Sequence, residues 1–285
     1  MAYIERMDTE AHISKAKLKF VRSLSQKKVR EEESLFVIEG WRAIEDACAA
    51  GMKARMFLHT AEAAEDAHFR SVFTRAAGLS GETFEVSVRE LETVTETVTP
   101  QGVAMVLPKF SHDLHGVLSR LNDEAPHIIV ALDRVSEPGN AGTIIRTADW
   151  FGADLVLLSE ESVGLFNPKV VRSTMGSLFH LPIIECARSA DDAQSKTGFL
   201  DALRLCHEAG FSLFGADVNG AADLRTVRWP KKSLIVIGNE AHGLSSGTAD
   251  VLDARIMIPK FGKAESLNAA TAAAVMLGAV RLSQT

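Results

Sequence analysis

The residues of this chain best suited to chemistry are polar side chains that follow apolar, strand-like runs. The first group lies in "EPGNAGTIIRTADWFG", residues 137–152, directly after the apolar run "HIIVALDRV". Gly139 and Gly142 allow a ligand to approach closely, but their spacing matches neither the G-x-G-x-x-G dinucleotide motif nor the phosphate-binding P-loop. Asn140 opens the predicted helix and Arg146 lies inside it, near the carboxyl end of the strand. The segment predicts a ligand site, with a surface ion pair as the alternative role for Arg146.

A second group lies in "VIGNEAHGLS", residues 236–245, where an apolar run stops at Gly238. Asn239 and Glu240 follow, and Gly243 closes the segment. Glycines on both sides of a carboxylate at a strand end indicate backbone groups presented to a ligand. An ordinary β-turn is the alternative.

The third group lies in "IPKFGKAESLNAATAAAV", residues 258–275. Ser266 is predicted to cap the final helix, with Leu267 and Asn268 in its first turn. Asn is a poor helix former in that position, and the amides at a helix N-terminus can bind an oxygen-bearing ligand. The segment therefore predicts either a simple helix cap or part of a ligand site.

Length and composition set the class of protein. The chain has 285 residues, 46% hydrophobic and 24% charged, which is enough for two modest domains or one large one. Cys48, Cys186 and Cys206 lie far apart, so neither a disulfide framework nor a zinc site is supported, and we expect no metal. The first residues contain no apolar stretch of the length that a signal sequence or membrane span requires. We expect a cytoplasmic protein with reduced thiols and no membrane partner.

The charge is distributed unevenly along the chain. The formal net charge is −6, yet residues 14–30 contain only basic ionisable residues. A basic arm on an acidic body suits a protein that binds a polyanion at one place, and a solvated helix face is the alternative. The predicted RNA contacts are Lys15, Lys17, Lys19, Arg22, Lys27, Lys28 and Arg30.

Two α/β domains are predicted from the order of apolar and helical segments. From Ser34 to Pro108 strand-like runs alternate with helical stretches, so residues 1–108 form the first domain. Residues 109–126 are the predicted linker, although "HGVLSRL" within them can form a helical turn. In residues 127–285 the runs "HIIVALD", "DLVLLS", "FSLFGAD", "SLIVIG" and "ARIMIP" are nearly continuously apolar, as in a parallel sheet covered on both faces. An Ala-rich helix over 267–282 ends the chain.

Four segments in this order resemble the motifs of one enzyme family: "EPGNAGTIIRTADWFGA", "NPKVVRSTMGSLFHLPI", "VIGNEAHGLS" and "IPKFGKAESLNAATAAA". The family is the SpoU/TrmH family of RNA ribose 2'-O-methyltransferases, within the SPOUT class. "LKFVRSLSQKKVREEESLFVIEGWRAIEDACAAG" and "TPQGVAMV" resemble the small substrate-binding α/β domain that many members carry. The resemblance spans nearly the whole chain, with departures at Lys260, Ala269 and Ala270.

The resemblance implies a fold, a cofactor and an assembly. The second domain would be a trefoil-knotted α/β sheet, and members dimerise through it. S-adenosylmethionine would be held largely by main-chain groups at Gly238, Ile258 and Leu267, with Asn239 and Gly243 shaping its loop. Gly238→Val is expected to fill space that the cofactor needs without unfolding the protein.

The resemblance also implies roles in catalysis. Arg146 would act on the ribose hydroxyl, and because its guanidinium is a permanent cation, we expect it to stabilise the developing alkoxide while an RNA phosphate or water accepts the proton. Asn140, Glu240, Ser266 and Asn268 would orient the ribose. The predicted function is S-adenosylmethionine-dependent 2'-O-methylation of structured RNA, with ribosomal RNA favoured over transfer RNA.

Three other functions remain open at this point. The chain could methylate transfer RNA, or it could be a non-catalytic RNA-binding or ribosome-assembly factor. The presence of all five predicted catalytic residues argues against a factor without activity. A nucleotide-dependent oxidoreductase fits the α/β alternation, but the dinucleotide fingerprint is missing.

Overall fold

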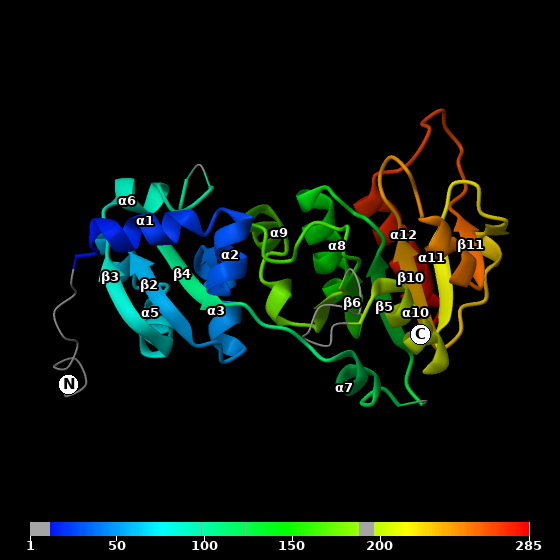
Figure 1. Ribbon diagram of the computed structural model, residues 1–285, viewed down its shortest axis with the longest axis horizontal. Helices are drawn as coiled ribbons and strands as arrows, with labels where there is room; N and C mark the ends of the chain where they lie inside the picture. The colour runs from blue at the N-terminus through cyan, green and yellow to red at the C-terminus, as the bar shows by residue number, and fades with distance from the viewer. Residues whose placement is uncertain (1–11, 98, 123, 188–196, 285) are drawn as a thin grey trace. The chain divides into compact units, whose positions relative to one another are not determined.

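A computed structural model of the protein describes residues 12–97, 99–122, 124–187 and 197–284 (Figure 1). Residues 1–11, which the sequence assigns to the first domain, lie outside the described residues. The chain divides into two compact units, the first formed by Met1–Phe110 with Phe166–Phe179 and the second by Ser111–Leu165 with His180–Thr285.

A four-stranded mixed sheet forms the centre of the first unit. Its order is β1-β4-β2-β3, with β4 antiparallel to both neighbours and β2 parallel to β3. The strands are β1 (Leu35–Glu39), β2 (Ala54–His59), β3 (Ser80–Glu85) and β4 (Val103–Pro108). Along the chain these strands alternate with helices, which confirms the α/β alternation predicted from Ser34 to Pro108.

Helices pack on this sheet through their apolar sides. Val21 and Leu24, at the end of the first helix, join Leu58, Leu91 and Val106 in one buried cluster. Lys15, Lys19 and Arg22 of the first helix are exposed, whereas Lys17 lies over the Phe84 ring and pairs with Glu82. The helices are α1 (Lys15–Ser23), α2 (Lys27–Glu33), α3 (Trp41–Ala49), α4 (Ala61–Glu65), α5 (Arg70–Leu79), α6 (Val88–Glu92), α9 (Pro168–Ser173) and the 3₁₀ turn η1 (Ser177–Phe179).

The second unit is built on a seven-stranded sheet of order β7-β6-β5-β10-β8-β11-β9, in which every pair of neighbours is parallel. This confirms the predicted parallel sheet. The edge strands with three and two residues, β7 and β9, were not predicted because such short strands carry no periodic signal. The strands are β5 (His127–Leu132), β6 (Leu155–Leu158), β7 (Ile183–Glu185), β8 (Ser212–Ala216), β9 (Ala222–Asp223), β10 (Lys232–Ile237) and β11 (Ala254–Met257).

Helices cover both faces of the seven-stranded sheet. On one face Ile129 and Ala131 of β5 pack with Leu203 and Phe199 of α10 and with residues of α7. Side chains alternate along a strand, so the other buried residues of β5 point to the opposite face, where α12 packs on β10 and on α8. The helices are α7 (Leu114–Leu118), α8 (Pro138–Trp150), α10 (Phe199–Glu208), η2 (Leu224–Thr226), α11 (Ser246–Val251) and α12 (Ala269–Ser283).

The two units differ in detail from the predicted domain limits. The predicted linker contains α7, whose Leu114 and Val117 are buried in the core of the second unit. The segment Phe166–Phe179 groups with the first unit, although it lies between strands of the second in the sequence. Within the described ranges, no helix combines the length and apolar character needed to span a membrane.

Candidate active site

The predicted site residues follow strands that end at one edge of the seven-stranded sheet. Parallel strands bring their carboxyl ends to the same edge, so the segments after β5, β10 and β11 meet there. Asn140 follows β5, Gly238 follows β10 and Ile258 follows β11. Because β8 separates β10 from β11, Gly238 and Ile258 stand about 10 Å apart across the sheet.

Three predicted catalytic residues form one chain of hydrogen bonds in the second unit. Asn140 Nδ2 donates to Glu240 Oε1 at 2.8 Å, and Asn268 Nδ2 donates to Asn140 Oδ1 at 2.9 Å. The three residues come from the start of α8, the turn after β10 and the start of α12. The side-chain amide of Asn140 keeps one N–H donor and one lone pair for further hydrogen bonds, since its Nδ2 group has two N–H donors and its Oδ1 has two lone pairs. The network, named here the Asn140–Glu240–Asn268 network, can therefore still bind a hydroxyl group.

Helix caps hold this network in place. Glu137 caps α8 by accepting from the Asn140 backbone N–H at 2.6 Å. Asn268 caps α12, because its Oδ1 accepts from the N–H groups of Ala270 and Thr271 at 2.9 and 3.3 Å. The same Asn268 side chain thus fixes a helix with its oxygen and Asn140 with its nitrogen.

The prediction that Ser266 caps the final helix is wrong. The helix begins at Ala269, and Asn268 has the extended backbone of an N-cap, with φ −57° and ψ 142°. Ser266 is exposed two residues before that cap. The poor helix propensity of Asn has no cost here, because a cap residue lies outside the helix proper.

The predicted cofactor turn is closed by hydrogen bonds within the segment Asn239–Gly243. Asn239 and Gly243 exchange two backbone N–H to carbonyl hydrogen bonds, with N–O distances of 3.0 and 2.9 Å, and Gly243 has φ +64°. Asn239 Oδ1 accepts from Ala241 N and His242 N, while its Nδ2 donates to the Arg134 carbonyl at 2.8 Å. Asn239 therefore shapes the turn and ties it to the end of β5.

Gly238 is required for packing against that turn. A Cβ on Gly238 would lie 2.5 Å from the Gly243 carbonyl carbon, and the atoms in the way are backbone. In Gly238→Val the side chain would meet the same backbone atoms, so we now expect that variant to disturb the turn as well as fill the space of the cofactor. Of the other predicted cofactor residues, Ile258 is half-buried and Leu267 is 48% exposed.

Arg146 lies outside the Asn140–Glu240–Asn268 network. It is exposed on α8, about 9 Å along the helix axis from Asn140 and about 120° around it. Among the described residues it makes no hydrogen bond or ion pair, so the surface ion pair considered from the sequence has no partner there. Its guanidinium remains available to a substrate.

Arg134, directly after β5, is a charged residue at the same edge that the sequence analysis missed. It has a left-handed backbone, with φ +59°, held by donation of its N–H to Ser159 Oγ at 2.8 Å. Its Nη2 lies 3.5 Å from the Gly243 carbonyl, and its Nε, buried without a hydrogen bond, lies 3.5 Å from Asp133 Oδ1. A guanidinium with unused donors beside the turn can bind an anionic group. Its only signal in the sequence is its position after an apolar run.

The predicted RNA contacts of the first unit fall into two groups. Arg30 is buried, and its Nη1 donates to the carbonyls of Leu24 and Ser25 at 3.0 and 2.6 Å. It therefore holds the end of α1, which removes it from the predicted RNA-binding set. Lys17 pairs with Glu82, and Lys28 lies 3.7 Å from Glu32. Within the predicted set, the exposed cations without an ion pair among the described residues are Lys15, Lys19, Arg22 and Lys27.

The three cysteines are buried free thiols. Burial raises the pKa of Cys186 and of Cys206 to about 12 and also raises the pKa of Cys48. Such thiols stay protonated and unreactive near neutral pH. In the part of the chain that the structure describes, no three His, Cys, Asp or Glu residues gather as a metal site would require.

Comparison with known proteins identifies the family. Residues 127–278 match the SpoU rRNA Methylase family, and residues 15–105 match the MRM3-like substrate binding domain. The chain therefore belongs to the SpoU rRNA methylase family, as its four motifs indicated.

Individual relatives cover nearly the whole chain. The AdoMet-bound rRNA methyltransferase from Sinorhizobium meliloti is 31% identical, with a TM-score of 0.81 over 95% of this chain and 96% of that one. AviRb from Streptomyces viridochromogenes, in complex with the cofactor AdoMet, is 28% identical, with a TM-score of 0.80 over 94% and 98% of the two chains. The 23S rRNA (guanosine(2553)-2'-O)-methyltransferase RlmP of Bacillus subtilis is 28% identical over 92% of this chain and 94% of its own length.

Proposed function

We propose that this protein transfers a methyl group from S-adenosylmethionine to a ribose 2'-hydroxyl of ribosomal RNA. The observation that carries the proposal is the Asn140–Glu240–Asn268 network, which joins three of the four family motifs beside the Asn239–Gly243 turn. Relatives named as 23S rRNA 2'-O-methyltransferases favour ribosomal RNA over transfer RNA.

The residues at the sheet edge suit the cofactor in kind. Gly238 and the turn it packs against offer backbone groups, while Ile258 and the exposed Leu267 offer apolar surface for an adenine ring. Arg134 offers a cation for a carboxylate. When bound, S-adenosylmethionine supplies a methyl group already activated by a positively charged sulfur.

The chain's own residues then have to position a hydroxyl and stabilise charge. The unused positions on Asn140 and the second oxygen of Glu240 can fix the ribose hydroxyl, and such positioning contributes up to about 7–11 kcal/mol to lowering a barrier. Arg146, as a cation without a partner among the described residues, stabilises the oxyanion that develops on the ribose. The proton passes to an RNA phosphate or to water. Ser266, exposed before α12, remains a candidate contact to the ribose.

The target of methylation can be found in cells that lack the gene. Mapping of 2'-O-methyl groups in their RNA should show the loss of one modified position in ribosomal RNA and no change in transfer RNA. Restoring the gene should restore that position, and a copy encoding Arg146→Ala should not. An unchanged ribosomal RNA map would refute the proposed target class.

We also propose that the protein is a homodimer that pairs through its second unit and that this unit carries the family's trefoil knot. Trp150 of α8 is 84% exposed, and Val275 and Leu282 of α12, seven residues apart, are 38% and 74% exposed. Arg146 shares a helix face with Trp150, so a second copy seated on these residues would border the active site. Light scattering at micromolar concentration should give a dimer, and Trp150→Glu should give monomers. An active wild-type monomer would overturn the proposal.

A further inference from the structure

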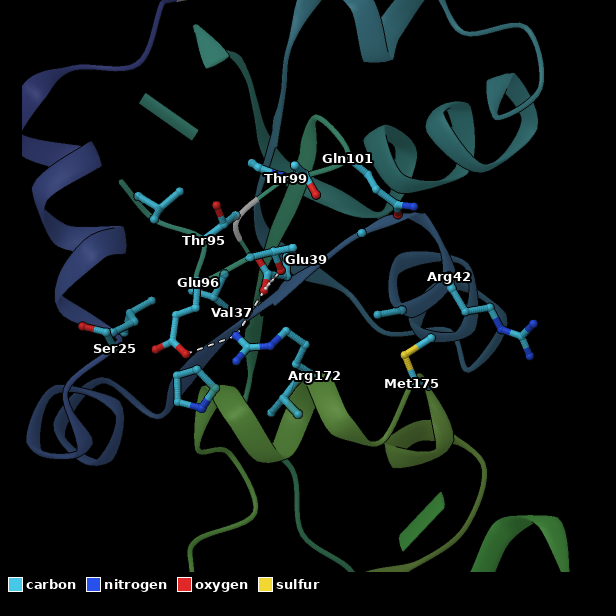
Figure 2. A pocket seen from close by; sticks show the side chains of 18 residues that line it. Ser25, Val37, Glu39, Arg42, Thr95, Glu96, Thr99, Gln101, Arg172 and Met175 are labelled. Carbon is cyan, nitrogen blue, oxygen red and sulfur yellow. Dashed lines mark hydrogen bonds and ion pairs between the residues drawn. The ribbon is translucent and has the colours of Figure 1, made fainter. Parts of the chain in front are cut away.

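The first unit contains a cavity that the proposed methyl transfer does not use (Figure 2). Its volume is about 360 Å³, within the range of about 300–1,000 Å³ typical of small-molecule sites. Its walls come from the end of β1, the segment before β4 and the residues of α9. Val37, Val94 and Val171 give it apolar surface, and none of the predicted catalytic or cofactor residues lines it.

One wall of the cavity is a guanidinium held in a fixed orientation. Arg172 Nη1 lies 3.1 Å from Glu96 Oε2 and 3.4 Å from Glu39 Oε1, and Figure 2 shows its side chain between those two carboxylates. Glu39 is fixed in turn, because Thr97 Oγ1 donates to it at 2.6 Å. Both ion pairs of Arg172 use its Nη1, and its side chain is 34% exposed. The flat face and the remaining donors are therefore open to a ligand.

A second wall is an exposed methionine on a strained backbone. Met175 is 51% exposed and has φ +52°, a backbone conformation that residues other than glycine rarely adopt. The next residue, Gly176, is also at positive φ, and a Cβ there would collide with the Asp46 side chain of α3. This turn places a soft, polarisable thioether at the rim of the cavity, a group that packs well against aromatic rings.

The charges of the walls select against a phosphate. Glu39 and Glu96 contribute two negative charges against the single positive charge of Arg172, and the nearby Arg42 is already paired with Asp46 at 3.1 Å. Glu39 Oε2 has no hydrogen-bond partner although it is buried. A flat, uncharged ring with its own donors and acceptors fits such a site better than an anion.

We propose that this cavity binds an unstacked nucleobase of the RNA, placed on the Arg172 guanidinium and against Met175, with its edge toward Glu39. This inference rests on RNA being the substrate, and it adds a base-reading site in the first unit. Single-stranded RNA is commonly read in this way, through stacking on arginine or aromatic planes and hydrogen bonds to base edges.

The site is tested by measuring how tightly the Met175→Ala and Arg172→Lys variants bind ribosomal RNA taken from cells that lack the gene. Loss of one stacked base should weaken binding by about 5- to 150-fold. The salt dependence should stay unchanged, because no phosphate contact is lost. Met52→Ala, which lies outside the cavity, is the matched control. Affinity within twofold of wild type for both variants, or a shallower salt dependence for Arg172→Lys, would overturn the proposal.

A second measurement does not depend on methyl transfer. With methyl-labelled methionine, the NMR spectrum of the protein should contain eight methionine methyl signals. The signal that disappears in Met175→Leu is that of Met175. Saturating guanosine, adenosine, cytidine or uridine should shift that signal through the ring current, and ribose 5-phosphate should not. A Met175 signal that none of the four nucleosides moves would refute the base site, whereas failure of the proposed function would appear separately as absent RNA methylation.

Discussion

Polar groups are used differently at the edge of the seven-stranded sheet and on the basic helices of the first unit. At the sheet edge, Asn140 binds Glu240 and Asn268, which lie 100 and 128 residues away in the sequence, so each side chain has a fixed orientation before any ligand arrives. On α1 and α2, Lys15, Lys19 and Lys27 are exposed, without an ion pair among the described residues. The first arrangement suits chemistry that depends on sub-ångström placement, and the second suits electrostatic attraction to a polyanion, which tolerates mobile side chains.

The largest effect is expected for Arg146, which lies outside the Asn140–Glu240–Asn268 network. Removal of one donor to a developing oxyanion typically lowers the rate by about 10²–10³, so Arg146→Ala should lose at least that in turnover while binding both substrates. Arg146→Lys keeps the charge without the planar fork and should recover part of the rate. Single-turnover methyl transfer into saturating RNA measures both, and a rate within threefold of wild type for Arg146→Ala would end its catalytic assignment.

Gly238 tests whether the sheet edge depends on a rigid turn. Because even a Cβ would meet the backbone of Gly243, Gly238→Ala should destabilise the protein by about 1–3 kcal/mol and weaken the binding of S-adenosylhomocysteine. Gly262→Ala is the matched control, since a Cβ there meets no atom within 4 Å. Denaturant unfolding and calorimetry report the two effects. Equal stability of the two variants would show that the turn can move aside.

The basic helices should respond through salt dependence and not through chemistry. Neutralising Lys15, Lys19 and Lys27 should lower the salt slope by about 0.7–0.9 per lost phosphate contact. Between 50 and 200 mM salt, the loss of RNA affinity should therefore be about 20- to 40-fold smaller in the triple variant than in wild type. Cofactor affinity should not change.

Exposed cations elsewhere provide the control for the basic helices. Neutralising Lys53, Arg204 and Lys231 should leave the RNA salt slope as in wild type. If both triple variants keep the wild-type slope, α1 and α2 are merely solvated helices.

The smallest effect separates the two functions of Asn268. Asn268→Ala loses the helix cap and should cost about 1 kcal/mol of unfolding free energy. Asn268→Asp keeps the capping oxygen but cannot donate to Asn140, so it should unfold like wild type and still turn over more slowly. Unfolding and single-turnover rates measured on both variants make the distinction. Normal turnover in Asn268→Asp would reduce the residue to a helix cap.

The sequence predicted the parallel sheet and the family because both depend on strong, local signals. Runs such as "HIIVALD" are apolar throughout, and four motifs in fixed order are specific. Arg134 was missed because what sets it apart is its left-handed backbone angle, which the sequence does not show. Strand β9 was missed because a strand of two residues has no hydrophobic periodicity.

Two other predictions were wrong because residue type alone does not show which hydrogen-bond partners a side chain has. Arg30 was counted among the RNA contacts, although the carbonyls that bind it follow α1. Ser266 and Asn268 are both good caps, and only the backbone conformation shows that Asn268 is the one used. The meeting of Asn140 with Glu240 depends on strand order, which no local pattern reveals.

The central claim is that the sheet edge methylates a ribose in RNA. The most direct test incubates the purified protein with methyl-labelled S-adenosylmethionine and ribosomal RNA from cells lacking the gene, then digests the RNA to nucleosides for mass spectrometry. The account predicts label in one 2'-O-methylated nucleoside with the wild-type protein and none above background with Arg146→Ala. Label on a base, or no transfer to RNA by a protein that binds S-adenosylhomocysteine, would contradict it.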